Sequence, residues 1–306
     1  MSKPKLAISV GDLNGVGIEI IFKAHEEISK LCEPLYCINT SMLEQAANLL
    51  FKKIPNDFQI HEVPGEFDIH IGEVDAQSGE YSFNSFMHAV KLTEDGKVDG
   101  VVTMPIHKEA WMLAGLEYKG HTDMLRKHFH KEAIMMLGCD EMYVALFTEH
   151  IPLKDVPSFV TKKRVENFLI DLYKSIGHKE VAVLGLNPHA GDNGVLGNEE
   201  KEIEAAIKSV NAKIGEKLFY GPIVPDIAFA PHFRKNFNYF VAMYHDQGLA
   251  PLKALHFDES VNISLNLPII RTSVDHGTAF DIAYKGKANS LSYINAIKSA
   301  ISFIKK

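Results

Sequence analysis

The stretch LAISVGDLNGVGIE, residues 6–19, contains the pattern on which the fold is built. Its apolar run at 6–10 is typical of a buried strand, and the glycine-containing turn at 11–17 then opens a helix. Further short apolar runs predict buried strands at 35–38, 101–104, 133–137, 144–147 and 181–186. Strands that alternate with helical segments along the whole chain predict an α/β fold with helices layered on a mostly parallel sheet.

The segments between these runs space their apolar residues as helices do. The clearest is 199–214, where acidic residues occupy the first turn and one apolar stripe is formed by Ile203, Ala206, Ile207, Val210 and Ile214. The C-terminal segment has the same kind of face, made by Ile294, Ile297, Ile301 and Ile304. The acidic, glycine-containing stretch 64–79 is expected to be a surface excursion.

Composition bounds the class of protein. A chain of 306 residues with 46% hydrophobic content can bury a large core, which excludes collagen, coiled coil and disorder and suggests about two domains. The net charge of −7 gives no sign of a nucleic-acid partner. Three scattered cysteines without a CxxC pair favour the reducing cytoplasm, and no apolar stretch is long enough for a membrane helix.

Four of the 15 histidines follow apolar strand-like runs, namely His150, His189, His245 and His276. Carboxyl ends of parallel strands are where open α/β sheets place ligands. Any one of these histidines is more simply a core or capping residue. Three neutral imidazoles that met at one point would bind a divalent ion and leave a position open for substrate. Asp246, beside His245, fits a second ligand, a base, a helix cap or a carboxylate that orients an imidazole.

Two other stretches suggest anion binding. In GHTD at 120–123, Thr122 or Asp123 can start a helix whose free amides suit a phosphate or carboxylate, although an ordinary helix cap explains the residues equally well. Lys253, Asn262 and Arg271 lie in a cation-rich stretch, where an internal salt bridge is the simpler explanation for Arg271. The glycines of the first turn do not match the GxGxxG register of dinucleotide-binding proteins.

The sequence resembles the 4-hydroxythreonine-4-phosphate dehydrogenase family of pyridoxal phosphate biosynthesis, essentially from end to end. The motifs that carry the resemblance are GDLNGVGIE at 11–19, MPIHK at 104–108, GHTDML at 120–125, LNPHAGDNGVLGNEE at 186–200, AMYHDQGLAPLK at 242–253 and LPIIRTSVDHGTAFDIAYKGKAN at 267–289. The chain departs from the usual family form GDPAGIGPE at Leu13, Asn14, Val16 and Ile18. Asp123 stands where the family often has Glu.

The resemblance implies a fold like that of isocitrate and isopropylmalate dehydrogenases, with two α/β/α domains around a deep cleft. Residues 1–120 and about 270–306 would form the terminal domain. Residues about 121–269 would form the central domain, which carries the metal and dimer-interface residues. It also implies a homodimer whose active site lies at the subunit interface.

The resemblance further implies a site-residue set. One divalent ion (Zn, Mg or Co) would bind His150, His189 and His245, the last reaching in from the neighbouring subunit. Substrate contacts would come from His121, Thr122, Lys253, Asn262 and Arg271. By a looser similarity, His276, Gly277 and Asp281 would lie along NAD or NADP, and an Asp281 bond to a ribose hydroxyl would favour NAD.

The reaction that the resemblance implies is oxidation of 4-hydroxy-L-threonine 4-phosphate at C3, followed by decarboxylation to 3-amino-2-oxopropyl phosphate. Asp246 or Lys253 is the expected catalytic base, and the sequence does not choose between them. The alternative is a relative that acts on a four-carbon sugar-acid phosphate such as threonate or erythronate 4-phosphate. A hydrolase or acyl-transfer enzyme lacks support because no G-x-S-x-G elbow is present. A non-catalytic metal-binding protein is the remaining class.

Overall fold

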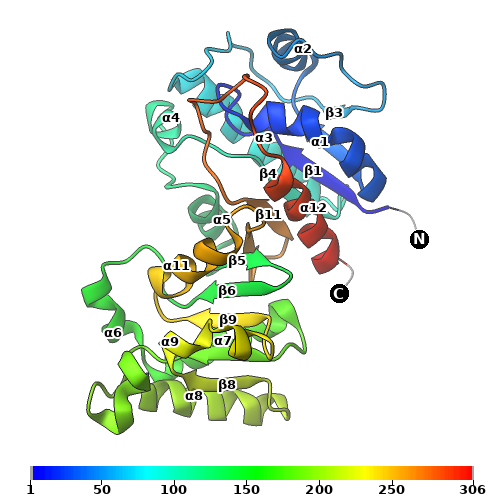
Figure 1. Cartoon of the computed structure of the whole chain (residues 1–306). Helices are drawn as coiled ribbons and strands as arrows, with labels where there is room; N and C mark the ends of the chain where they lie inside the picture. Colours follow the sequence, from blue (N-terminus) through cyan, green and yellow to red (C-terminus); the bar gives the residue numbers. More distant parts are fainter. Residues whose placement is uncertain (1–2, 305–306) are drawn as a thin grey trace. The chain divides into compact units, whose positions relative to one another are not determined.

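The chain folds into two compact units, seen in a computed structural model that describes residues 3–304 (Figure 1). Unit 1 comprises Met1–Lys131, Val261–Ile263 and Leu267–Lys306, and unit 2 comprises Glu132–Ser260 and Ser264–Asn266. Residues 121–131, which the resemblance assigns to the central domain, therefore belong to unit 1. The chain crosses between the units without a Pro/Gly/Ser-rich linker.

Unit 1 is built on parallel strands in the order β3-β2-β1-β4-β11. Their bounds are β1 Lys5–Ser9, β2 Glu33–Cys37, β3 Gln59–His61, β4 Gly100–Thr103 and β11 Arg271–Val274. The helices of this unit are α1 Gly17–Leu31, α2 Thr40–Leu49, α3 Ala76–Glu94, α4 Lys108–Leu113, α5 His121–Phe129 and α12 Leu291–Ile304. Helix α3 packs on β1, and α12 packs on β11 and β4. Strands β1, β4 and β11 are buried along nearly their whole length, as apolar parallel strands require, whereas β3 at the end of the strand order has no buried residue.

Unit 2 has strands in the order β5-β6-β9-β7-β8, of which only the pair β5 and β6 is antiparallel. The strands are β5 Ile134–Cys139, β6 Met142–Leu146, β7 Val181–Leu184, β8 Phe219–Ile223 and β9 Tyr239–Ala242. The helices are η1 Leu153–Asp155, α6 Val156–Phe159, α7 Lys162–Ile176, η2 Pro188–Gly194, α8 Glu199–Ile214, α9 Pro225–Ala228, α10 Pro231–Arg234 and α11 His245–His256. Figure 1 shows α8 alongside β8, which it contacts.

The remaining strand, β10 Val261–Leu265, is divided between the units and follows β11 in the strand order. The core of unit 2 is formed where α11 lies on β6 and β9, with Val144, Phe240, Leu249 and Leu252 almost without exposure. Burial of such side chains stabilises a unit by roughly 1.5–3 kcal/mol each.

The α/β class is confirmed, and strands lie at each of the six apolar runs. The helix expected at 199–214 has those bounds, with Glu199, Glu200 and Glu202 in its first turn. Two expectations need correction. Helix α5 begins at His121, with Gly120 at its N-cap, rather than at Thr122 or Asp123. The expected excursion 64–79 ends early, because α3 begins at Ala76 behind the Asp75 cap.

Between residues 3 and 304, no helix combines the length and the hydropathy of a membrane span.

Candidate active site

The three histidines expected to bind metal follow three neighbouring strands of unit 2. His150 comes after β6, His189 after β7 and His245 directly after β9. Because β9 lies between β6 and β7 and is parallel to both, the three carboxyl ends meet at one edge of the sheet.

Two of these histidines lie together within the chain. The ring centroids of His150 and His245 are 5.5 Å apart, with an angle of 43° between the rings. The Nδ1 atom of His245 donates to Oδ1 of Asp246 at 2.7 Å. This bond fixes the tautomer that leaves Nε2 of His245 as an electron-pair donor. Among residues 3–304, no three His, Cys, Asp or Glu side chains form a group that could hold a metal, so His189 does not complete a set with the other two.

The position of His245 depends on the two residues that follow Asp246. The buried Gln247 side chain accepts from the Met243 N–H and donates to the Gly185 carbonyl, both at 2.7 Å. A Cβ on Gly248 would come within 2.5 Å of Val144, so only glycine lets α11 lie this close to β6. These contacts fix the first turn of α11, and sequence reasoning missed both residues although they lie inside the AMYHDQG motif.

His189 lies in a left-handed turn. Its φ is 53°, and Ala190, Gly191, Asp192 and Asn193 also have positive φ. Each non-glycine residue in this region costs roughly 1–2 kcal/mol, so the surroundings must hold the turn in place. Glu200 does so, because its Oε1 accepts from the N–H groups of Leu186 and Asn187 at 2.9 and 2.7 Å. Glu200 is a third residue that sequence reasoning missed, after Gln247 and Gly248.

Lys253 and Asp246, the two candidate bases, lie on one face of α11. They are seven residues apart, which places them about two turns, or roughly 10 Å, from one another along the axis. Asp246 is occupied by its bond to His245. The ammonium of Lys253 lies 5.4 Å from the centroid of the Phe257 ring. The two side chains therefore face different neighbours.

Unit 1 contains a buried cation, Arg271, at the start of β11. The side chain is 2% exposed, and Nη2 donates to the Thr103 hydroxyl at 2.7 Å. Burial lowers the pKa of Arg271 to about 9. Burial and the nearby Arg271 also hold the pKa of His121 well below its usual value of 6.5. His121 is therefore neutral at physiological pH, and the guanidinium is the only charge of this pair.

His121, at the first position of α5, is enclosed by aromatic rings. The centroids of Phe86 and Trp111 lie 4.5 and 5.6 Å from its ring, both edge-on. Its Nε2 atom is buried and has no hydrogen-bond partner, and the same is true of Oδ1 of Asn262 on β10. Thr122 is the next residue of α5, whose N-cap glycine offers no side chain to the first amides. An unpaired buried His121 nitrogen near the Arg271 guanidinium, together with the unpaired Asn262 oxygen in the same unit, fits an anionic ligand with hydroxyl and amine groups.

The segment expected to bind the cofactor is a loop that follows β11. His276 Nδ1 donates to the Gly277 carbonyl at 2.9 Å, while its Nε2 is buried without a partner. Space around Gly277 is open, and the Asp281 side chain is exposed. The Phe280 ring stacks on His107 with centroids 5.0 Å apart and an angle of 13°. This contact places His107, the histidine of the MPIHK motif, against the candidate cofactor loop.

The first glycine turn, residues 11–17, packs against this loop. The Val16 N–H donates to the Thr278 carbonyl at 3.0 Å, and the Tyr284 hydroxyl donates to the Leu13 carbonyl at 2.8 Å. A Cβ on Gly15 would come within 2.8 Å of the Thr278 carbonyl oxygen. The close approach therefore requires glycine at this position. Although the turn lacks the GxGxxG register, it packs against the loop that the resemblance assigns to the cofactor.

The family model described as pyridoxal phosphate biosynthetic protein PdxA matches residues 30–300. The chain belongs to this family. A Sulfurimonas denitrificans protein called 4-hydroxythreonine-4-phosphate dehydrogenase is 69% identical over 302 residues, 99% of this chain and 98% of that protein. A Campylobacter fetus subsp. fetus protein of the same name is 56% identical, over 98% of each chain. The Klebsiella pneumoniae 4-hydroxythreonine-4-phosphate dehydrogenase crystal structure has a TM-score of 0.83, at 33% identity over 99% of each chain. These matches confirm the resemblance stated from the motifs.

Proposed function

We propose that the protein is an NAD(P)-dependent dehydrogenase that oxidises 4-hydroxy-L-threonine 4-phosphate at C3 in pyridoxal phosphate biosynthesis. When bound, the nicotinamide would accept the hydride from C3, and the resulting β-keto acid would lose carbon dioxide to give 3-amino-2-oxopropyl phosphate. The observation that carries this proposal is the name of relatives that are 56–69% identical over nearly the whole chain. The buried polar atoms described above support it, because they match the chemistry of a small phosphorylated amino acid.

The anionic groups of the substrate would bind in unit 1. Arg271 supplies a buried positive charge, and its fork suits a phosphate or carboxylate. Neutral His121 and the amides at the start of α5, next to Thr122, supply donors without adding charge. Asn262 would accept from a substrate N–H or O–H through its unpaired Oδ1. Together these contacts would fix the orientation of C3.

His150, His189 and His245 would hold one divalent ion, Zn, Mg or Co, which when bound lowers the pKa of a hydroxyl and stabilises an enolate. Two of these donors support the assignment, because the rings of His150 and His245 are adjacent and Asp246 fixes the tautomer of His245. His189 would have to complete the set. Since Asp246 has this orienting role, we assign removal of the C3 hydroxyl proton to Lys253. Lys253 would then also contact the substrate.

His276, Gly277 and Asp281 would lie along the cofactor. The exposed carboxylate of Asp281 would accept from ribose hydroxyls, which favours NAD because a 2′-phosphate would meet a like charge. The open space around Gly277 leaves room for the cofactor to approach the backbone. We further propose a cytoplasmic homodimer with the active site at the subunit interface.

The test compares substrates under one set of conditions. The purified protein, supplied with Zn, Mg or Co and with NAD or NADP, is given 4-hydroxythreonine 4-phosphate, threonate 4-phosphate or erythronate 4-phosphate, and NAD(P)H formation is followed. We expect the highest kcat/KM with the amino substrate and with NAD. Higher kcat/KM with a sugar-acid phosphate would transfer the assignment to that substrate class. Absence of nicotinamide reduction with all three would overturn the proposal.

A further inference from the structure

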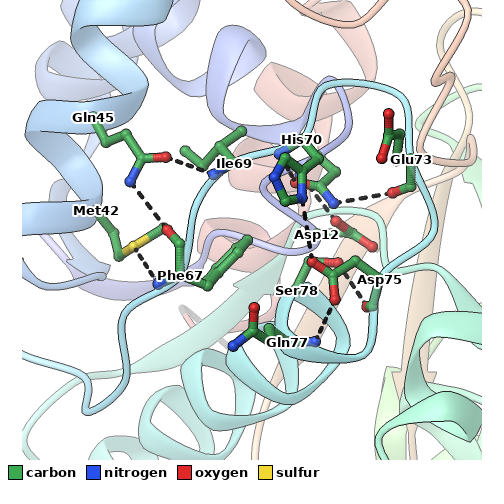
Figure 2. A network of polar contacts seen from close by, with 11 residues as sticks. Asp12, Met42, Gln45, Phe67, Ile69, His70, Glu73, Asp75, Gln77 and Ser78 are labelled. Carbon is green, nitrogen blue, oxygen red and sulfur yellow. Dashed lines mark hydrogen bonds and ion pairs between the residues drawn. The ribbon is translucent and has the colours of Figure 1, made fainter.

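The segment 62–75 lacks regular structure over most of its length, yet three side-chain amides hold it in place. Asn39 donates to the carbonyls of Val63 and Gly65 at 2.9 and 2.7 Å. Gln45 donates to the Phe67 carbonyl and accepts from the Ile69 N–H. Figure 2 shows Gln45 facing Ile69 and Phe67, with His70 next to the Asp75 cap. Amide side chains thus replace the strand partner that this backbone lacks.

The third amide belongs to Asn14, in the first glycine turn. Its Oδ1 accepts from the His70 N–H and its Nδ2 donates to the Glu73 carbonyl, both at 3.0 Å. Its own carbonyl accepts from the Gly72 N–H at 2.9 Å. Asn14 itself has no exposed surface, although its partners His70 and Glu73 are exposed, so its two side-chain bonds are partly shielded from water. An alanine, which the usual family form GDPAGIGPE has here, would keep only the backbone bond.

The hydrogen bonds of Asn14 thus hold Gly72 itself and residues before and after it in the chain. Gly72 lies against the candidate cofactor loop. A Cβ on Gly72 would be 3.1 Å from the Phe280 carbonyl oxygen. The φ of Gly72 is 78°, a conformation that favours glycine. The same turn touches this loop through Val16 and Thr278. The loop is thus supported by the turn on one side and by Gly72 on another, and Asn14 connects the two supports.

We propose that Asn14 is a positioning residue for the nicotinamide cofactor, acting by holding Gly72 and the first turn against the 276–281 loop. The proposal rests on the proposed function, in which that loop binds NAD. Asn14 touches neither the buried anion-binding atoms of His121 and Asn262 nor the histidines of unit 2. We therefore expect a substitution of Asn14 to affect cofactor binding more than substrate binding.

The experiment measures NADH binding by fluorescence, without metal or substrate, and the steady-state constants of the complete reaction. Asn14→Ala is expected to raise the NADH Kd and the NAD KM roughly five- to tenfold, the equivalent of about one lost hydrogen bond. The kcat and the KM of the phosphorylated substrate should change less than about twofold. Gly72→Ala, which disturbs the same contact from the other side, should show the same pattern.

Gln45→Met is the matched control. It removes two hydrogen bonds from the same segment, but these bonds hold Phe67 and Ile69 rather than Gly72, which lies against the cofactor loop. It should lower the thermal midpoint while leaving the NADH Kd unchanged. An equal rise in Kd for Gln45→Met, or an unchanged Kd for Asn14→Ala, would overturn the positioning role. Failure of the unmodified protein to bind NADH would instead overturn the proposed function, and this proposal with it.

Discussion

At the scale of single residues, the carboxyl of Asp12 in the first turn has a strongly shifted pKa. Its side chain has no exposure and its Oδ2 has no hydrogen-bond partner. Burial raises the pKa of Asp12 from 3.8 to about 6, against the lowering effects of the Asn14 N–H and the Ser78 hydroxyl. His107 lowers and Asp75 raises the same pKa. The carboxyl of Asp12 is therefore easier to protonate in the folded state than in the unfolded state.

This difference predicts a pH-dependent stability. Because the folded pKa is raised, the carboxyl contributes stability that is complete below pH 3.8 and is lost as pH rises through about 6. The loss amounts to at most about 3 kcal/mol. Asp12→Asn should remove this dependence. In urea unfolding, the difference in unfolding free energy between Asp12→Asn and the unmodified protein should move in favour of the mutant as the pH rises from about 4.5 to about 7. Asp68→Asn, at an exposed carboxylate, is the control. If the unfolding free energies of Asp12→Asn and of the unmodified protein changed with pH in parallel, the raised pKa of Asp12 would not be the cause of the pH dependence.

Residue identity could be predicted from motifs, but residue environment could not. The family motifs named His121 and Arg271, yet the enclosure of His121 by Phe86 and Trp111 depends on segments far away in the sequence. Its neutral state follows from that enclosure. For the same reason the sequence could not assign Asp246 to His245, because neighbouring residues in a chain face one another only when the backbone allows it.

At the scale of elements, the left-handed turn around His189 depends on the first turn of α8. Glu200→Ala removes the acceptor for the Leu186 and Asn187 N–H groups. We expect a loss of roughly 1–3 kcal/mol in unfolding free energy and a fall of about 10- to 100-fold in metal affinity, because His189 loses its support. Glu204→Ala, which removes only an exposed ion pair with Lys208, is the control. Calorimetric titration with Zn²⁺ measures the affinity, and equal values for the two variants would contradict this role.

Apolar runs predicted the strands because burial on both faces leaves a local signature. The same reasoning described 64–79 as a surface excursion, since its residues are polar. What fixes this segment is a set of amide bonds from Asn14, Asn39 and Gln45, which lie between 22 and 59 residues away. Such bonds leave no periodic pattern in the sequence. The start of α5 was misplaced for a related reason, because a glycine N-cap carries no side chain to mark the boundary.

At the scale of the whole molecule, the candidate residues are divided between two units with separate cores. Unit 1 holds His121, Asn262, Arg271 and the cofactor loop, and unit 2 holds the three histidines and Lys253. The motifs identified all of these residues without showing how they are distributed. Within the described residues a single chain gathers no three metal ligands. Our proposal, taken from the resemblance, is that a second subunit completes the site.

Subunit mixing tests that arrangement. His189→Ala and His245→Ala should each lose bound metal and turnover as pure proteins, whereas His232→Ala, at an exposed position of α10, should keep both. If His189 and His245 of one site come from different subunits, a mixed dimer of the two variants contains one intact site. Refolding an equal mixture should then restore about a quarter of the original activity, since half of the dimers are mixed and each has one of two sites. If all three ligands came from one chain, every site in the mixture would lack a ligand and no activity would return.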